Sequence, residues 1–493
     1  MQDKGRRRRF SLSAHLFDST GMSETLSRSL FYVILSVAFG AVYSVVTTGA
    51  AWTGFVRKLG ADSFTLGMLT AIPLAASAVQ IFIAYLIERT GKRRQLFIWG
   101  GIIGRSLWAP IGIIPYIIPM SNEALRMASL MIVVGVCSCS NAIINVGFYS
   151  LVSDIVPMHI RGRYFASRST LSLIASVITG ILVSQLIDRT SGYTGYTIAL
   201  IVAGIFGAVD ICCYLRVKWP QMKLPESKPT PLVTMVRAVF RHKQFRTIMF
   251  IMTYYGFAVN LGAPFYNVYM LEVVKMTYTQ VTLINQVLPN IIAVFIISWW
   301  GRRMDSFGNK PVLNATGLFM MIYPLLWMFS GVGSFFMIIV LNIFTGMLSN
   351  AFDLSNQNLY MNAAPDTNRS MFISVYFAVT QLLGNALGNL TGGWLLENTL
   401  PTLESLRLTL IVFPMTRYHF LFALSAIMRI SMIFFMLPLI REENAEPMGV
   451  MLKTSANEII QSSRRVSAMV QKEIKRMRAR RTLKRFEQGK IKP

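Results

Sequence analysis

Charged residues are scarce in this sequence for a chain of its length. Among 493 residues only 14% are Asp, Glu, Lys or Arg and 53% are hydrophobic, and the mean hydropathy is +0.50. Soluble domains carry about a quarter charged residues, so this composition excludes a chain that only water solvates. Apolar stretches of about twenty residues, the length that crosses a bilayer as a helix, recur along most of the sequence. The sequence therefore predicts a polytopic membrane protein.

Residues that hold metals or perform catalysis are equally few. The chain has four histidines and four cysteines, and every cysteine lies inside an apolar stretch. No disulfide framework or zinc-binding spacing follows from these positions. The sequence also has no His-Glu-x-x-His pattern and no glycine loop of the kind that cradles phosphate. We therefore expect no metal, no cofactor and no enzyme activity, and any energy for work must come from an ion gradient or a solute gradient.

Twelve apolar spans can be recognised, six before and six after a longer polar linker rich in proline and basic residues. The linker composition does not enter lipid, so it marks a boundary between two parts of the chain. The predicted fold is all-α, with spans at 29–56, 63–86, 96–119, 125–152, 165–187, 195–216, 246–271, 277–300, 311–331, 333–360, 371–397 and 417–440. The predicted parts are a basic segment (1–28), a first six-helix part (29–216), the linker (217–245), a second six-helix part (246–440) and a basic tail (441–493).

Basic residues predict the orientation of the spans. The net charge of +26 would also suit nucleic acid, but Lys and Arg gather in the tails and in alternate loops, which favours an anionic membrane surface. Lys and Arg near span ends stay on the cytoplasmic side. We therefore expect both termini in the cytoplasm and no nucleic-acid partner. The short exterior loops favour a bacterial plasma membrane.

An internal repeat relates the two halves. After the second span the chain has Ala84, Glu88, Gly91 and Arg93, and after the eighth span Gly301, Asp305, Gly308 and Lys310 follow at the same spacing. A Pro-x-x-x-Arg pattern recurs in the same way, ending at Arg161 after the fourth span and at Arg369 after the tenth. Motifs repeated in the same order about 210 residues apart indicate a duplicated architecture.

These loop motifs resemble the major facilitator superfamily, whose loop between helices 2 and 3 has the pattern Gly-x-x-x-Asp-x-x-Gly-x-Arg/Lys. The second copy here fits the pattern better, because Ala84 and Glu88 replace Gly and Asp in the first. The resemblance covers about residues 29–440. It implies two six-helix bundles around a central cavity that opens alternately to each side, in a secondary active transporter. The resemblance does not indicate a substrate.

Within that family pattern the loop motifs predict a cytoplasmic gate. Their acidic residues would contact basic residues or helix N-termini of the other half and hold the cytoplasmic side shut. The alternative is that these are only polar turns with basic topology signals. The candidate gate residues are Glu88, Gly91, Arg93, Arg161, Arg163, Asp305, Gly308, Lys310 and Arg369.

Amide side chains mark a candidate cavity wall. Polar groups within spans usually face the bundle interior or a wet cavity, although they also hydrogen-bond neighbouring helices. Neutral amides suit a polar solute bearing hydroxyl or amide groups better than a strongly anionic one. The candidate substrate residues are Asn141, Asn145, Asn260, Asn267, Gln286, Asn350, Gln357, Gln381 and Asn385.

Four charged residues lie well inside the spans, away from their ends. Asp353 shares a helical face with Asn350 and Gln357, and a carboxylate taken out of water holds a proton more readily, so Asp353 is the candidate proton carrier. The other three, which fall on spans that the resemblance places at the periphery, we expect to be paired or to reach toward the membrane surface. They are Arg105, Asp210 and Arg429.

The basic tail is the last feature. Val466, Val470, Ile474 and Met477 recur at helical spacing among many basic residues, which predicts an amphipathic helix on the anionic inner leaflet. A tail without structure that only sets topology is the alternative. The predicted partners are a small-molecule substrate and the lipid bilayer, and we expect a monomer.

Other functions remain open at this point. A drug/proton antiporter on the same fold is one, although the fifth span lacks the proline of the motif that such antiporters carry there. A non-transporting membrane receptor or a membrane-embedded enzyme are alternatives of another class, because a fold does not fix a function.

Overall fold

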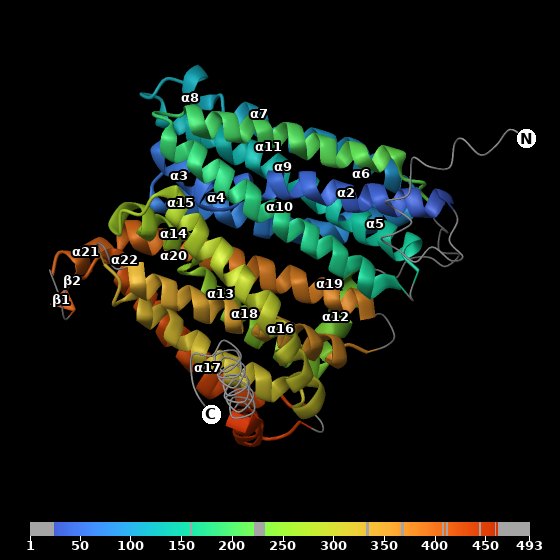
Figure 1. The fold of residues 1–493 in the computed structure, drawn as a ribbon, viewed down its shortest axis with the longest axis vertical. Coiled ribbons are helices and arrows are strands. Elements are labelled where there is room, and N and C mark those ends of the chain that lie inside the picture. The colour runs from blue at the N-terminus through green and yellow to red at the C-terminus, as the bar shows by residue number, and fades with distance from the viewer. Residues whose placement is uncertain are drawn as a thin grey trace, which may run out of the picture.

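The computed structural model describes residues 24–157, 160–220, 232–331, 335–365, 369–406, 409–410, 413–442, 445–458 and 460–461. Figure 1 shows long helices that run side by side in two groups, the N-terminal half coloured blue to green and the C-terminal half yellow to red. A short antiparallel pair of two-residue strands, β1 (Thr409–Leu410) and β2 (Phe413–Pro414), lies in the loop before the last span.

Six spans make up the N-terminal half, and several are broken into shorter helices. The third is interrupted twice because Pro110 and Pro115 have no backbone N–H to donate. The elements are α2 (Glu24–Thr47) with α3 (Ala50–Lys58), α4 (Ser63–Ala76) with η1 (Ser77–Val79) and α5 (Gln80–Thr90), α6 (Arg93–Ser106) with α7 (Trp108–Ile111) and α8 (Ile114–Ile117), α9 (Glu123–Ile155), α10 (Arg161–Arg189), and α11 (Thr194–Cys213) with η3 (Tyr214–Arg216).

The C-terminal half repeats this order after the linker helix α12 (Leu232–Arg241). Its spans are α13 (Lys243–Asn260) with α14 (Ala263–Val268) and η4 (Tyr269–Val273), α15 (Tyr278–Thr282) with η5 (Leu283–Val287) and α16 (Leu288–Phe307), α17 (Asn309–Trp327), α18 (Phe335–Ala363), α19 (Arg369–Val379) with η6 (Thr380–Ala386) and α20 (Leu387–Asn398), and α22 (Arg417–Ser431) with η7 (Met432–Met436) and η8 (Leu437–Leu439). A short helix, α21 (Leu400–Glu404), precedes the last span.

These elements confirm the predicted all-α fold of twelve spans. Ten described helices are long and apolar enough to cross a membrane. The broken third span and α17 complete the twelve. Each half packs within itself, with α2 against α10 and α11 in the first bundle and α18 between α16 and α17 in the second. The halves therefore form two six-helix bundles.

The apolar cores reveal which end of the molecule joins the bundles. One large buried cluster draws on both halves and includes Phe55 and Tyr196 from the first and Phe265 and Tyr269 from the second. We call the end that carries this cluster and the loops 59–62 and 274–277 the closed end. Figure 1 shows it at the left, with α3, α14, α15 and α20.

At the opposite end, where α2 begins and η8 ends, the main buried clusters are separate for the two bundles. One is built from N-terminal residues such as Leu30, Phe97 and Tyr214, and the other from C-terminal residues such as Phe245 and Tyr376. Burial of apolar surface therefore joins the bundles mainly at the closed end.

Two glycines of the repeated motif shape the turns at the opposite end. Gly91 ends α5 with a φ of 65°, and Gly308 separates α16 from α17 with a φ of 91°. A positive φ strains most residues that have a Cβ, so both turns favour glycine.

In each bundle the segment after the sixth span folds back onto this turn. In the first bundle Arg93 donates to the carbonyl of Pro220 at 3.4 Å and stacks on Trp219. In the second, the carboxylate of Glu442 accepts hydrogen bonds from the backbone N–H groups of Asn309 at 3.1 Å and Lys310 at 2.6 Å. These contacts brace the motif loop against the end of its own bundle.

The helix at 448–458 extends this brace in the C-terminal half. Arg303 donates from Nη1 to Glu458 Oε1 at 3.1 Å, and this hydrogen bonding lowers the pKa of Glu458. Met451 is buried in an apolar cluster with Met304 and Val312. The predicted amphipathic helix further along the tail, with Val466 to Met477, lies outside the described residues.

Replacing the motif glycine should destabilise the second bundle. A Cβ on Gly308→Ala would impose strain at a φ of 91° and lie 3.1 Å from the Cβ of Ala445, so we expect a loss of about 1–3 kcal/mol. The matched control is Gly301→Ala, seven residues earlier in α16, where a Cβ meets nothing within 4 Å. Thermal unfolding in mild detergent should show a lower midpoint only for Gly308→Ala. Equal midpoints for the two variants would contradict this account of the turn.

Candidate functional site

The closed end brings two helices of different bundles to backbone contact. A Cβ on Gly67 in α4 would lie 2.6 Å from the carbonyl oxygen of Asn389, and a Cβ on Gly393 in α20 would lie 2.5 Å from the carbonyl oxygen of Ser63. Only glycine permits this distance, as at other close helix crossings in membranes. The two helices therefore form the tightest seam between the bundles.

Polar links reinforce this seam. Arg57 at the end of α3 forms an ion pair with Glu272 in η4, with 2.7 Å between Nε and Oε1. The backbone N–H of Ser63 donates to Glu397 of α20 at 2.7 Å. Both links connect a residue of the first bundle to one of the second, so both must break if this end opens.

Asp188 makes a third link at the closed end. Its carboxylate accepts hydrogen bonds from the backbone N–H groups of Tyr278 at 2.9 Å and Thr279 at 2.8 Å. It thereby caps α15 of the other bundle, where the helix has free N–H groups and a positive dipole end. Tyr278 also shares a hydrogen bond with the hydroxyl of Tyr196 at 2.6 Å.

The predicted gate residues of the first bundle lie at the opposite end. Arg93 is buried and pairs with Asp154 of α9 at 2.7 Å. Arg161 donates weakly to backbone carbonyls at the end of α9, and Arg163 is exposed. The side chain of Glu88 lies outside the described part of the structure. The described contacts therefore stay within one bundle.

Their counterparts in the second bundle behave in the same way. Asp305 is exposed, the backbone N–H of Lys310 donates to Glu442, and Arg369 donates to the carbonyl of Met361 at 3.2 Å. No described contact in this conformation joins these gate residues across the bundles. The gate stays a prediction about the state in which this end closes.

A cavity of about 320 Å³ separates the bundles between α10 and the η5–α16 region. Ser169, Ser172 and Ser176 line it from the first bundle, and Gln286 and Asn290 line it from the second. Of the predicted cavity residues, Gln286 lies here. Hydroxyl and amide groups from both bundles can donate to and accept from one solute at this position.

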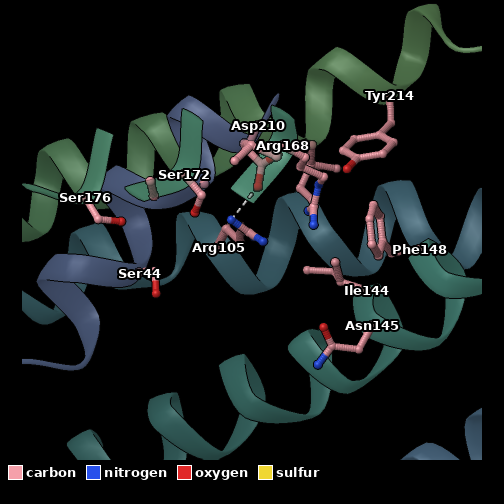
Figure 2. Close-up of a pocket in the computed structure, with 14 residues that line it drawn as sticks. Ser44, Arg105, Ile144, Asn145, Phe148, Arg168, Ser172, Ser176, Asp210 and Tyr214 are labelled. Atoms are coloured by element: carbon pink, nitrogen blue, oxygen red, sulfur yellow. Dashed lines mark ion pairs between the residues drawn. The ribbon is translucent and has the colours of Figure 1, made fainter. Parts of the chain in front are cut away.

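A second pocket of about 220 Å³ continues into the first bundle. Figure 2 shows Arg105, Arg168 and Asp210 around it, with Ser172 and Asn145 on its walls. Asn145 is thus a second predicted cavity residue that lies at a pocket. Asn141, one turn earlier in α9, donates instead to the hydroxyl of Tyr43 at 3.0 Å.

Several other predicted amides pair with each other inside the second bundle. Asn260 of α13 donates to Asn385 at 2.9 Å, and Asn385 donates to Gln381 at 2.6 Å. Asn285 donates to Asn267 at 3.0 Å. These contacts match the alternative interpretation of the amides as links between helices, and they satisfy polar groups away from water.

The remaining predicted residues share one face of α18. Asn350, Asp353 and Gln357 are all exposed, and their spacing of three and four residues places them together. The proton-carrier role of Asp353 stays a prediction.

The buried charges of the first bundle are paired, as expected. Arg105 and Asp210 form an ion pair with 2.6 Å between Nη1 and Oδ2, and Arg105 also lies over the ring of Tyr43 at 4.4 Å. In the second bundle Arg429 is buried and donates to the carbonyl of Met320 at 3.1 Å.

Arg168 was missed by the sequence analysis. It lies in the fifth predicted span, yet its closeness to the span end makes it look like one more basic topology signal. The structure places it on the walls of both pockets. No pattern in the sequence distinguishes it from Arg163, because only the packing of α10 against α2 and α11 turns Arg168 inward.

The sequence also matches a known family along most of its length. The pattern of the Major Facilitator Superfamily matches residues 32–299 and 263–478. The chain belongs to the Major Facilitator Superfamily. Membership and the fold indicate a multi-pass membrane transporter. The described residues contain no group of three or more His, Cys, Asp or Glu that could hold a metal.

Solved structures of this superfamily have the same fold. The nucleoside transporter NupG is similar with a TM-score of 0.60 at 12% identity, covering 85% of this chain and 100% of that one. An auto-inhibited POT family peptide transporter is similar with a TM-score of 0.66 at 10% identity, covering 85% of this chain and 98% of that one. A bacterial homolog of the human lysosomal transporter Spinster, solved in an inward-facing and occupied conformation, has a TM-score of 0.61 at 14% identity. The match covers 90% of this chain and 98% of that one. The comparison with curated proteins found no match.

Removing the carboxylate that caps α15 should loosen the closed end. Asp188→Ala deletes three charge-assisted hydrogen bonds that cross the bundles, from the backbone N–H groups of Tyr278 and Thr279 and from the hydroxyl of Thr279, worth about 1.5–3 kcal/mol each. We expect the ratio of molecules that are open at this end to molecules that are closed there to rise about tenfold or more. The measurement is electron–electron double resonance between spin labels at Leu125→Cys and Thr402→Cys, both exposed, after replacement of the native cysteines.

Asp62→Ala provides the matched control. Asp62 caps α4 of its own bundle through Thr65 N–H at 2.7 Å, so its loss costs helix stability without cutting a link between the bundles. A similar shift in both variants would show that Asp188 acts through general destabilisation.

Proposed function

We propose that this superfamily member moves a small polar solute by alternating access, as a secondary active transporter. The observation that supports this most strongly is the asymmetry between the two ends. Apolar burial, a glycine seam and three sets of polar links join the bundles at the closed end, while the main clusters at the opposite end are separate. An interface concentrated at one end suits two rigid bundles that rock about a central site.

The energetics favour such motion. Each cross-bundle hydrogen bond contributes only about 0.5–1.5 kcal/mol net, or somewhat more where a charge takes part. The internal contacts of each bundle are far more numerous, because whole helix faces pack there. Thermal motion and solute binding can therefore part the seam without unfolding either bundle.

The distribution of basic residues supports an orientation. The opposite end carries Arg93, Arg161, Arg302 and Lys310 together with α12 and the described helix at 448–458, and Lys and Arg near span ends favour the cytoplasmic side. We therefore assign that end to the cytoplasm, which makes the present conformation inward-facing with both termini inside. A bacterial plasma membrane with an anionic inner leaflet suits the basic tail.

The transport proposal requires a second conformation. Spin labels at Leu125→Cys and Thr402→Cys report the closed end, and labels at Gln95→Cys and Asn362→Cys report the opposite end, all at exposed positions. In lipid nanodiscs we expect two populations. In each of them the distance between the labels is short at one end of the molecule and long at the other. A single population at both ends under every pH and solute condition would falsify alternating access.

The predicted gate should matter only in that second conformation. If Asp305 contacts the other bundle when the cytoplasmic end closes, Asp305→Ala should lower the population with a short distance at that end about threefold to tenfold, the loss expected for one partly exposed ion pair or helix-dipole contact. Labels at Gln95→Cys and Asn362→Cys measure it, because both positions are exposed.

Glu446→Ala serves as the control for Asp305, because its side chain is exposed at the same end of the same bundle. Unchanged populations in Asp305→Ala, or an equal change in Glu446→Ala, would remove Asp305 from the gate.

A further inference from the structure

The cavity between the bundles and the pocket inside the first bundle form one continuous space. They share Arg168, Ser172 and Ser176 as lining residues. Together they lead from Gln286 and Asn290 of the second bundle to the Arg105–Asp210 pair of the first. Figure 2 shows Ser172 and Arg168 facing the same space from α10.

The charges around this space do not balance. Arg105 and Asp210 neutralise each other through their ion pair at 2.6 Å. Arg168 is the remaining charged residue among those that line the two pockets, so the lining carries a net charge of +1. An unpaired cation within a membrane protein is costly, and it commonly marks a ligand or ion pathway.

Arg168 is held in position, and the one carboxylate within its electrostatic range among the lining residues, that of Asp210, is already paired with Arg105. The guanidinium of Arg168 lies over the ring of Phe148 at 4.2 Å, which orients the planar group, and its Nε is buried without a hydrogen-bond partner. Within the described residues it makes no ion pair or hydrogen bond. A planar fork of donors with free capacity fits a carboxylate, which accepts two parallel hydrogen bonds.

Neutral donors surround this guanidinium. Ser169, Ser172 and Ser176 follow each other at spacings of three and four on α10, so their hydroxyls share one helix face. Across the cavity Gln286 and Asn290 offer amide groups from the second bundle. The space thus has one cationic pole and a neutral polar wall.

We propose that this space binds a small organic carboxylate, with the carboxylate on Arg168 and the polar remainder against Gln286 and Asn290. This inference rests on the proposed transport function and names its substrate class. The neutral amides alone had pointed away from an anionic solute, and Arg168 reverses that expectation. A solute held by both bundles at once would favour the state in which they approach each other at the cytoplasmic end.

Thermal unfolding of the purified full-length protein in a non-ionic detergent tests the proposal. The probes are the sodium salts of lactate, succinate and benzoate, with lactamide, succinamide and benzamide as neutral counterparts, all at equal ionic strength. We expect at least one carboxylate to raise the unfolding midpoint and its amide to leave the midpoint unchanged. In Arg168→Gln the apparent affinity should fall about tenfold or more, because charged hydrogen bonds are lost.

Two further variants separate binding from folding. Arg189→Gln removes an exposed arginine from the same helix and should leave the carboxylate response intact. Arg168→Lys keeps the charge but loses the planar fork of donors. This variant should fold like the wild type and bind the carboxylate more weakly. A carboxylate response that persists in both Arg168 variants would overturn the assignment.

Other anions supply the remaining arms. Inorganic phosphate and detergent micelles doped with phosphatidylglycerol test a free phosphate and a lipid headgroup. If phosphate or the lipid stabilises the protein in a way that requires Arg168, and no carboxylate does, that anion would replace the carboxylate as the proposed ligand. If no carboxylate raises the unfolding midpoint, the carboxylate proposal is rejected. Neither result would touch the distance changes that test alternating access, so the two proposals fail separately.

Discussion

The backbone contact between α4 and α20 is the constraint on which the rest of this structure depends. Gly67 and Gly393 bring the helices so close that a single Cβ would collide with a carbonyl oxygen of the other bundle. At that distance the aromatic cluster around Phe55 and Tyr269 can close over both halves. The polar links at Arg57 and Asp188 then fall within reach. The same seam, placed at one end, leaves space between the bundles elsewhere.

The distribution of polar contacts is compatible with the proposed movement of the two bundles as separate bodies. Inside the bundles, amides and charges satisfy one another, as Asn260 does with Asn385 and Arg105 does with Asp210, because lipid offers them no partner. Between the bundles the links are few and lie near the water-facing end, where broken hydrogen bonds can be replaced by water. Rigidity is thus concentrated within each half and compliance between them.

The sequence was sufficient for the architecture and insufficient for the site, for a physical reason. Hydropathy and span length depend on neighbours in the chain, so the twelve helices and the motif turns at Gly91 and Gly308 could be predicted. The contact of Arg57 with Glu272 joins residues 215 positions apart, and nothing local indicates it. Arg168 likewise lines the pockets only because of the way α10 is rotated in the bundle. The amides divided between cavity walls and helix links, which spacing alone does not resolve.

The repeated motif has a role in this conformation that its charges alone did not suggest. In each bundle the segment that follows the sixth span returns to the turn after the second, through Trp219 and Pro220 at Arg93 and through Glu442 at Asn309 and Lys310. The two halves use different residues for this contact, so what they share is the attachment of the motif turn to its own bundle and not a particular side chain. These contacts hold the motif loop to its own bundle. Under the proposed alternating access, the loop's acidic residue would then return to the same place each time the bundles close. If the predicted gate forms, this brace from within each bundle lets it open and close repeatedly without losing register.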